Sequence, residues 1–383
     1  MRKFIATICT VTLLFASASL AVAQDAATIR GIFASAPKEA TTVGAVSIFV
    51  GPPKGFNPLA ASGEELARYG LPQRPDQAAD PTRYARWAKA MTALQTRATG
   101  LTEMPYHHAP MKPIATQPSA RAVANVPGSV GSYNWSGVVN TNKNTKWNVN
   151  TSFTEVESYW PVPFAQPPLE ACANGIKGPF LESTWNGIDG FNSGDVIQGG
   201  SSIYSACTGK PVYNGWVEWY PSYAELQIDC GSKACVVSPG DVFYVVTYGT
   251  SGTATQTVYE EDTTQGWYIT ASLPWVSGPG LIGNSEEQVV ERPCCVTVGS
   301  SEDDYALNHY NYEWFGDAQG EDGHETAFYA GEQTTSTYLL TMYDDSGTIA
   351  ISYVEEQGST GNAGKYSLMF SDENCAYTGG CTP

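Results

Sequence analysis

Short β-type runs dominate the sequence from residue 129 to the C-terminus. They are rich in Val, Ile, Thr, Tyr and Trp, and Gly, Asn, Ser and Asp separate them. Many short runs with regular turn residues and almost no helical periodicity are typical of an all-β sandwich or barrel. A segment of about 250 residues is also long enough to form one large core. The sequence therefore predicts an all-β domain over residues 129–383.

The N-terminus has the pattern of a secretory signal peptide. Residues 2–3 are basic, residues 4–20 are largely apolar, and the small residues Ala21-Val22-Ala23 follow. The apolar run is too short, and too rich in small residues at its end, to be a good membrane span. We therefore predict cleavage after Ala23 and a secreted protein, extracellular or periplasmic, that has no membrane partner.

The two segments that follow differ sharply in charge. Residues 24–128 hold 11 Lys and Arg against 7 Asp and Glu, whereas residues 129–383 hold 7 against 31. The basic segment has two helical patterns, one over Gly63–Arg68 and one that begins with Asp80 as N-cap and continues to Gly100. Residues 104–127 are rich in Pro and lack periodicity, which predicts a linker.

The charge difference suggests that residues 24–128 are a partly helical propeptide. A basic segment is attracted to an acidic domain near neutral pH, and the attraction fades as carboxylates gain protons. We expect this segment to inhibit the domain and to be removed by acid-triggered cleavage between Asn125 and Ser132. The alternative is an accessory segment that stays attached. The net charge of −24 on residues 129–383 disfavours nucleic acid as a partner.

Eight of the nine cysteines lie in residues 129–383. An even number of cysteines in an exported domain predicts disulfides, although the sequence leaves the pairing open. Two short loops could be closed, by Cys230 with Cys235 and by Cys375 with Cys381. There is no C-x-x-C motif and only two histidines fall in this domain, so we expect no zinc site and no other cofactor.

The stretch from Trp185 to Gln198 predicts a β-hairpin. Gly-rich and Asn-Ser-Gly turn residues separate its two apolar ends, and Asp189 lies between two of the glycines. An amide such as that of Gln198 donates two hydrogen bonds and is never charged, which suits an oxyanion stabiliser that works at low pH. The alternative is an ordinary polar side chain on a solvated sheet face.

Other hydrolytic sites fit the sequence less well. No G-x-S-x-G motif is present, and His107-His108 lies in the predicted linker, so a nucleophilic triad is disfavoured. Asp345-Ser346-Gly347-Thr348 resembles half of a paired-aspartate peptidase site, but no second copy exists and its setting is that of a hairpin turn.

Two glutamates on predicted strands could do acid and base chemistry. Glu218 shares a strand face with Trp216 and Tyr220, and Glu287 shares one with Val289. Partial desolvation raises the pKa of a carboxyl group and suits it to proton transfer. The alternative for both glutamates is a solvated acidic face.

Seven short motifs follow one another through residues 129–383. They are Tyr133-Asn134-Trp135-Ser136-Gly137, Phe153–Val156 with Trp160-Pro161-Val162-Pro163, Trp185-x-Gly-Ile-Asp189-Gly, Ile197-Gln198, Trp216-x-Glu218-Trp219-Tyr220-Pro221, Gly240-Asp241, and Glu287 with Val290-Glu291. Each motif is weak alone, but together and in this order they resemble the eqolisins, the glutamic peptidases. The resemblance covers most of the acidic segment.

The resemblance implies a concanavalin-like sandwich of two antiparallel sheets and a Gln–Glu pair that cleaves peptide bonds at acidic pH without metal. By motif, Gln198 matches the catalytic glutamine and Glu287 the catalytic glutamate. The positions that line or support the site are Trp185, Asp189, Trp216 and Glu218. We expect protein or peptide substrates and a monomeric enzyme that is made as a zymogen.

The sequence departs from the family at the catalytic glutamate. The family usually has Ala-Glu-Trp there, whereas this chain has Glu286-Glu287-Gln288. Alternation would turn Glu286 and Gln288 toward a packed face, where polar groups are costly unless they are paired. A shift of one residue in register would make Glu286 catalytic instead, and we favour Glu287.

Two other functions use the same residues. A curved β-sandwich with paired carboxylates and exposed aromatic residues also suits a retaining glycoside hydrolase, although such an enzyme has no evident use for Gln198. A non-catalytic carbohydrate-binding sandwich would stack sugars on Trp185, Trp216 and Trp219. A binding module of that kind would keep its function after Glu287→Gln.

Overall fold

Strands make up most of the structure. The computed structural model describes residues 29–114, 129–142, 152–294, 304–310, 312–322, 327–329, 337–357 and 366–371. In chain order the elements are β1 (Lys38–Ala40), β2 (Ser47–Phe49), α2 (Gly63–Arg68), α3 (Pro81–Ala93), β3 (Thr96–Arg97), β4 (Gly100–Glu103), β5 (Ser129–Ser132), β6 (Trp135–Thr141), β7 (Phe153–Pro161), β8 (Ala165–Gln166), α4 (Leu169–Ala173), β9 (Phe180–Ile188), β10 (Val196–Ser205), β11 (Val212–Tyr220), β12 (Leu226–Asp229), β13 (Val242–Tyr248), β14 (Thr255–Asp262), β15 (Trp267–Pro274), β16 (Ser285–Glu291), β17 (Ala306–Leu307), β18 (His309–Tyr310), β19 (Tyr312–Asp322), β20 (Ala327–Tyr329), β21 (Thr337–Tyr343), β22 (Ala350–Gln357) and β23 (Tyr366–Ser371).

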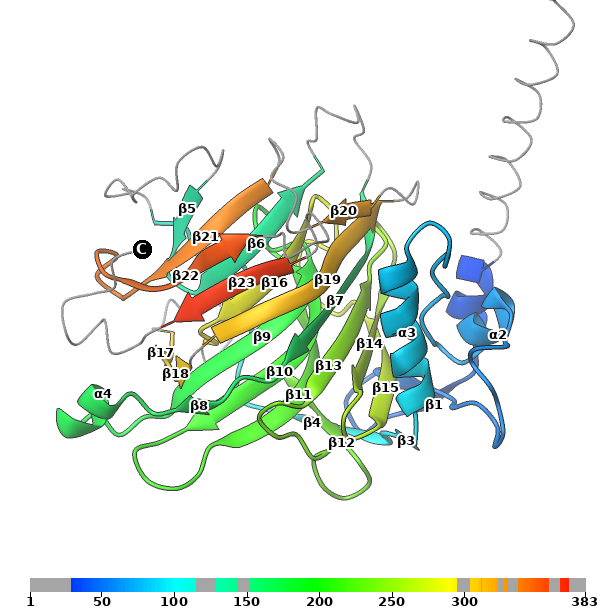
Figure 1. Cartoon of the computed structure of the whole chain (residues 1–383), viewed down its shortest axis with the longest axis horizontal. Coiled ribbons are helices and arrows are strands. Elements are labelled where there is room, and N and C mark those ends of the chain that lie inside the picture. The colour runs from blue at the N-terminus through cyan, green and yellow to red at the C-terminus, as the bar shows by residue number, and fades with distance from the viewer. Residues whose placement is uncertain are drawn as a thin grey trace, which may run out of the picture.

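Two antiparallel sheets pack against each other, which confirms the predicted sandwich (Figure 1). Neighbours in the first sheet run in the order β4, β12, β11, β10, β9, β16, β6 and β21. Neighbours in the second sheet run in the order β19, β7, β13, β14, β15 and β2. Strands β22 and β23 pair with each other and join β21 to β19, so one hydrogen-bonded ladder curves from the first sheet into the second.

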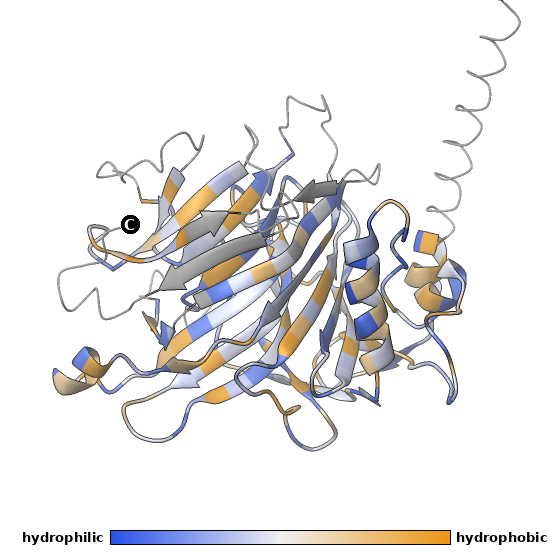
Figure 2. Ribbon diagram, viewed as in Figure 1, coloured by the Kyte–Doolittle hydropathy of each residue, from blue (hydrophilic) through white to orange (hydrophobic). Residues whose placement is uncertain are grey.

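Alternation along the strands gives the first sheet an inner and an outer face. Ile197 and Val217 point to the second sheet, where they pack with Val245 in the main core. Trp216 and Val289 belong to a separate cluster on the outer face. Figure 2 shows the mixture of apolar and polar residues along these strands. Because successive side chains alternate between faces, each strand serves both the core and the outer face.

Both helices predicted in the basic segment are present. The Oγ atom of Ser62 accepts from the backbone N–H of Glu65, and the Glu65 carboxylate accepts from the backbone N–H of Ser62, so α2 begins with a capping box. Asp80 caps α3 as predicted. The helix ends at Ala93 and not at Gly100, because the chain next pairs as β3 with β15.

The basic segment is bound tightly to the sandwich. Helix α3 packs on the second sheet, where Trp87 and Met91 join a cluster with Tyr159 and Tyr244 (Figure 1). Strands β2 and β3 pair with β15, and β4 pairs with β12, so the segment adds strands to the edges of both sheets. Covered edges of this kind cannot pair with another chain.

An ion-pair cluster also joins the two segments. The guanidinium of Arg83 on α3 lies 3.1 Å from Glu155, 2.8 Å from Glu157 and 2.7 Å from Glu321. Burial opposes the charge, but the three carboxylates hold the pKa of Arg83 well above its usual range. Arg83 therefore supplies one strong, partly buried attraction between the basic and acidic segments.

Residues 104–114 are not the irregular linker that the composition predicts. They cross the outer face of the first sheet, and we call them the strap. Their backbone pairs in turn with Glu225, Cys294, Gly190 and Gly131, which lie far apart in the sequence. His107 and His108, expected to lie in a loose linker, are only 6% and 0% exposed. The composition of the segment did not predict this bound structure, because the strap's hydrogen-bond partners come from four separate parts of the domain.

Disulfides are present, as expected. Cys230 pairs with Cys235 in the expected short loop, and Cys172 pairs with Cys207. Cys375 and Cys381 lie outside the described residues, as do the predicted signal peptide and the first half of the predicted cleavage region. Within the described ranges, no helix has the length and apolar character needed to cross a membrane.

The Asp-Ser-Gly motif is a turn, as its setting predicts. It lies between β21 and β22, where Asp344 accepts from the backbone N–H groups of Thr348 and Ile349. Gly347 has a φ of 68°, a conformation that favours glycine. The exposed Asp345 pairs with Arg292 at 2.8 Å. These contacts explain the motif as local structure.

Candidate active site

The β9–β10 hairpin and β16 bring the two predicted catalytic residues onto one row. Gly187 on β9 is paired with Gln198 on β10 and, on its other side, with Glu287 on β16. Direct cross-strand partners share a face, so Gln198 and Glu287 both lie on the outer face. With strands about 4.8 Å apart, their Cα atoms are about 10 Å apart across the glycine. Glu218 on β11 extends the same row beyond Gln198.

Gly187 leaves the space between the two side chains open. A Cβ atom at this position would lie 2.9 Å from the ring of Trp185, 3.1 Å from the Cβ of Gln198 and 2.8 Å from the Ile197 carbonyl oxygen. These approaches are too close for any side chain. The glycine therefore permits the close packing of β9 and β10 and keeps the centre of the row free of a side chain.

The register of β16 turns Glu286 away from this row. Glu286 is paired with Ile188 and faces the second sheet. Its Oε1 accepts from Asn140 Nδ2 at 2.6 Å and its Oε2 accepts from Gln288 Nε2 at 2.7 Å. The departure from the family's usual Ala-Glu-Trp is thus accommodated by polar residues that satisfy one another. Of the two glutamates, Glu287 is the one that faces Gln198.

Glu287 is fully buried beneath the outer face. Burial raises its pKa well above the ordinary value, and the negative charges of Asp189 and Glu286 raise it further. Neither of its carboxyl oxygens has a hydrogen-bond partner in the described part of the chain. Burial thus favours the neutral form of Glu287 in this covered state, and a buried carboxyl group with a raised pKa is a feature of functional sites.

Asp189 fixes the beginning of the strand that carries Glu287. It follows β9 with a φ of 71°, a conformation that only some residues adopt. Its carboxylate accepts from the backbone N–H groups of Ile282, Gly283 and Asn284 at 2.6, 2.9 and 2.8 Å. Three charge-assisted hydrogen bonds hold the loop immediately before β16. Asp189 therefore helps to position β16 through the loop that precedes it, and its side chain is not one of those that form the site.

The strap lies directly on Gln198. The Nε2 atom of Gln198 donates to the backbone carbonyl oxygen of His108 at 2.7 Å. The Glu218 carboxylate accepts from the backbone N–H of His108 at 3.0 Å and contacts His107 Nδ1 at 3.3 Å. Burial raises the pKa of Glu218, and the two histidines oppose that rise. Gln198 therefore holds the carbonyl oxygen, and Glu218 the backbone N–H, of the same strap residue.

The imidazole of His108 fills a buried pocket formed by Trp216, Glu225 and Glu291. Its ring is stacked on Trp216 with centroids 3.6 Å apart and planes 6° apart. Its Nε2 lies 2.9 Å from Glu225 and its Nδ1 lies 3.3 Å from Glu291. Burial alone would lower the pKa of His108, but these contacts raise it to about 10. The ring is therefore a cation between two carboxyl groups.

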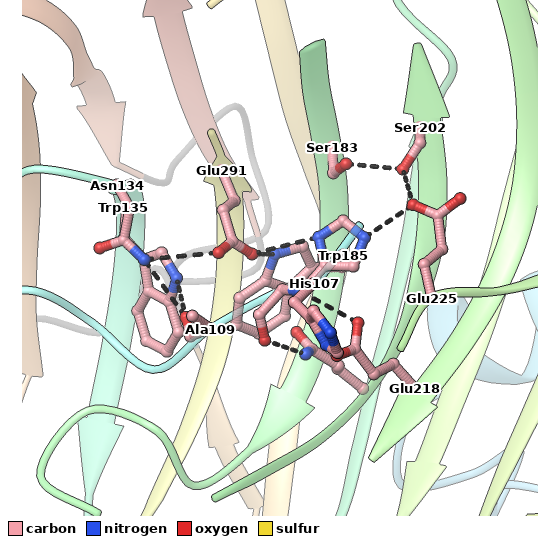
Figure 3. Close-up of polar contacts among 12 residues, drawn as sticks. His107, Ala109, Asn134, Trp135, Ser183, Trp185, Ser202, Glu218, Glu225 and Glu291 are labelled. Atoms are coloured by element: carbon pink, nitrogen blue, oxygen red, sulfur yellow. Dashed lines mark hydrogen bonds and ion pairs between the residues drawn. The ribbon is translucent and has the colours of Figure 1, made fainter. Parts of the chain in front are cut away.

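Trp185 lies between the His108 pocket and the row of residues that contains Gln198 and Glu287. Its Nε1 donates to Glu291 Oε2 at 2.9 Å, and its ring meets Trp135 edge to face at 4.9 Å (Figure 3). Burial raises the pKa of Glu291 to about 7, although the contact with His108 opposes the rise. Trp185 and Trp216 thus line the site with buried aromatic surface.

All six predicted site residues lie on or beside the outer face. Four further residues belong to the same site and were not predicted from the sequence: His107, His108, Glu225 and Glu291. The paired histidines between Pro105 and Pro110, in a segment otherwise without histidine, were the available signal. In the described residues, no group of three or more His, Cys, Asp or Glu is arranged to hold a metal ion.

Comparisons with solved structures return glutamic peptidases. Scytalido-glutamic peptidase with a transition state analog inhibitor has 18% sequence identity and a TM-score of 0.48, over 62% of this chain and 98% of that chain. SCP-B, a member of the eqolisin family in a complex with the tripeptide Ala-Ile-His, has 18% identity and a TM-score of 0.44 over the same shares. None of the curated protein sequences matches this chain.

The family model of the peptidase A4 family matches residues 133–360. The match covers more than half of the chain and includes β6 through β22, with Gln198 and Glu287 inside it. The resemblance found in the sequence is thereby confirmed, and the chain belongs to the peptidase A4 family, the eqolisins, as a glutamic endopeptidase.

Proposed function

We propose that this peptidase acts at acidic pH through Glu287 and Gln198 and is exported as a zymogen. One observation carries the proposal: the amide of Gln198 donates to a peptide carbonyl oxygen on the face that it shares with Glu287. An oxyanion stabiliser must donate to that atom of a substrate. This contact favours peptide hydrolysis over the glycoside hydrolysis and sugar binding that the sequence left open.

The two side chains would divide the reaction between them. Ionised Glu287 takes a proton from a water molecule as the water oxygen attacks the carbonyl carbon. The carbonyl π electrons move to its oxygen, and the uncharged amide of Gln198 stabilises the oxyanion at any pH. Protonated Glu287 then gives its proton to the departing nitrogen as the C–N bond breaks. The cycle returns Glu287 to its ionised form.

The covered site explains why the intact chain would be inactive. Glu287 can act as a base only when ionised, and its burial under the strap raises its pKa well above the ordinary value. Removal of the strap would let water reach the carboxyl group and lower that pKa. The strap also occupies Gln198, so it blocks both members of the pair in different ways.

Proteolysis by the acid-treated chain tests the proposal. Unfolded casein is incubated with the protein between pH 2 and 7, with Gln198→Ala beside the wild type and with pepstatin in one arm to reveal paired-aspartate peptidases. We expect cleavage only on the acidic side, resistance to pepstatin, and a loss of about 10²-fold or more in Gln198→Ala. A folded wild-type protein that cleaves nothing at any pH contradicts the proposal.

N-terminal sequencing of the active protein tests the zymogen. We expect a new N-terminus between Asn125 and Ser132, which removes the covalent link between the strap and the sandwich. The strands and helix of the basic segment would then be held by non-covalent contacts alone. An active protein whose N-terminus is still Gln24 would show that the basic segment is an accessory part of the mature enzyme.

A further inference from the structure

The strap presents one peptide bond to Gln198, on the face that Gln198 shares with Glu287. Gln198 donates to the carbonyl oxygen of His108, so the bond from His108 to Ala109 lies where a cleaved bond would lie. The carbonyl oxygen of Ala109 is held too, by Trp135 Nε1 at 3.1 Å and Asn134 Nδ2 at 3.2 Å. The side chain of His108 therefore marks the pocket for the residue that precedes the cleaved bond.

The domain itself builds this pocket. Glu225 accepts from Asn214 Nδ2 at 3.1 Å and Ser202 Oγ at 3.2 Å, and also from the hydroxyl of Tyr204. Glu291 accepts from Trp185 Nε1. These donors lie on β9, β10 and β11, so both carboxyl groups have side-chain partners within the domain, while the backbone of Glu225 also pairs with Met104 and Tyr106 of the strap.

The shape and charge of the pocket suit a protonated imidazole. The stacked indole of Trp216 admits a flat group, and Glu225 and Glu291 lie at the two ring nitrogens, both of which donate in the cationic form. Glu218 is a third carboxyl group near enough to stabilise the charge of His108. An aliphatic side chain would take away the donor at each end of the imidazole and leave Glu225 and Glu291 only their partners in the domain, which is unfavourable for buried carboxyl groups.

We propose that Trp216, Glu225 and Glu291 form the subsite for the residue before the cleaved bond and that this subsite selects histidine. The inference rests on the proposed function, because it takes the carbonyl held by Gln198 as the one attacked. The guanidinium of arginine, flat and cationic but longer, is the second choice. The strap inhibits by meeting the same requirement through His108.

A peptide series tests the subsite directly. Peptides with the sequence of residues 104–112 carry His, Arg, Gln or Leu at the position of His108 and are incubated at pH 4 with the acid-treated full chain. Mass spectrometry locates the cleaved bond, and kcat/KM is measured for each peptide. A charge-assisted contact predicts that the His peptide is cleaved about 10- to 100-fold faster than the Gln peptide, between the residues that correspond to His108 and Ala109.

Variants of the enzyme assign that preference to the pocket. Glu225→Gln keeps the shape of the side chain. It should reduce the ratio of kcat/KM for the His peptide to kcat/KM for the Gln peptide to about threefold or less. Glu182→Gln is the matched control, because Glu182 is buried on the inner face beside Thr184 and should leave the ratio unchanged. If Glu225→Gln does not fold, Glu291→Gln replaces it with the same expectation.

The outcomes separate the inference from the proposed function. An enzyme that cleaves casein but shows equal rates for the His and Gln peptides overturns the subsite and leaves the peptidase mechanism intact. A His preference that persists in both Glu225→Gln and Glu291→Gln also overturns the subsite alone. An enzyme that cleaves neither casein nor any peptide overturns the proposed function and the subsite with it.

Discussion

Glu286 and Glu287 are adjacent, equally buried and chemically identical, yet they lie in opposite surroundings. Glu286 faces the inner side of the first sheet, where Asn140 and Gln288 donate to its two oxygens. Glu287 faces the outer side, across Gly187 from Gln198, and its oxygens have no hydrogen-bond partner in the described residues. Burial raises the pKa of both.

A shifted pKa therefore does not by itself identify a catalytic acid. The inner face contains further hydrogen-bonded polar groups, such as Asn186, which donates to Ser158 and to the Val245 carbonyl. Such networks make a polar core specific. The outer face instead leaves a carboxyl group without a partner, among the described residues, beside an amide that holds a peptide. What is particular to Glu287 is its place across Gly187 from Gln198, because Glu260 in the core between the sheets is also fully buried and its pKa is raised in the same way.

The strongest test of this comparison replaces each glutamate in turn. Glu287→Gln should reduce proteolysis about 10²- to 10⁴-fold, because an amide cannot take a proton from water. Glu286→Gln should keep activity within about threefold, since an amide can accept from Asn140 and donate to Gln288 after a rotation of its neighbour. Initial rates on unfolded casein at acidic pH measure both. Loss of activity in a folded Glu286→Gln variant with an active Glu287→Gln variant would reverse the assignment.

A smaller effect is expected from the strap. His108→Ala removes the cation between Glu225 and Glu291 and should weaken the strap's hold on the outer face. We expect the unprocessed chain to hydrolyse peptides at pH 6 about tenfold faster than the wild type. Lys54→Ala, at an exposed position of the same segment, is the control. Equal rates in both variants would mean that His108 does not help to hold the site closed.

The smallest expected effect concerns stability and pH. The pKa values of Glu182 and Glu286 are both raised to about 8 by burial. In the unfolded state these glutamates have their ordinary, lower pKa values, so between those values and about 8 the folded state binds more protons than the unfolded state. The stability of the folded state therefore falls as the pH rises through this window.

Thermal unfolding at pH 5, 6.5 and 8 measures this effect, in a Gln198→Ala background that limits self-digestion. We expect the midpoint to fall by at least about 3 °C between pH 5 and 8, and Glu286→Gln should reduce the fall. Glu64→Gln, at an exposed position, should not change it. A midpoint that rises with pH would contradict the protonated state of the inner-face glutamates.

Local patterns in the sequence predicted many of the strands and both of the helices α2 and α3. Alternating runs with Gly and Asn turns predicted the β9–β10 hairpin, and Asp80 before a proline predicted the start of α3. These signals are local because turns and caps are made by neighbouring residues. The prediction of a helix as far as Gly100 was wrong because β3 and β4 gain their hydrogen bonds from β15 and β12, which are remote in the sequence.

The sequence by itself determined the sandwich and the family, because alternation and motif order survive in a linear pattern, and it predicted six site residues that the structure places on or beside the outer face. Only the tertiary structure decided which of Glu286 and Glu287 faces Gln198, since register depends on the partners of β16. It alone showed that a proline-rich stretch crosses the site and delivers His108 to Gln198. Composition describes a segment on its own, whereas the strap's structure comes entirely from what it touches.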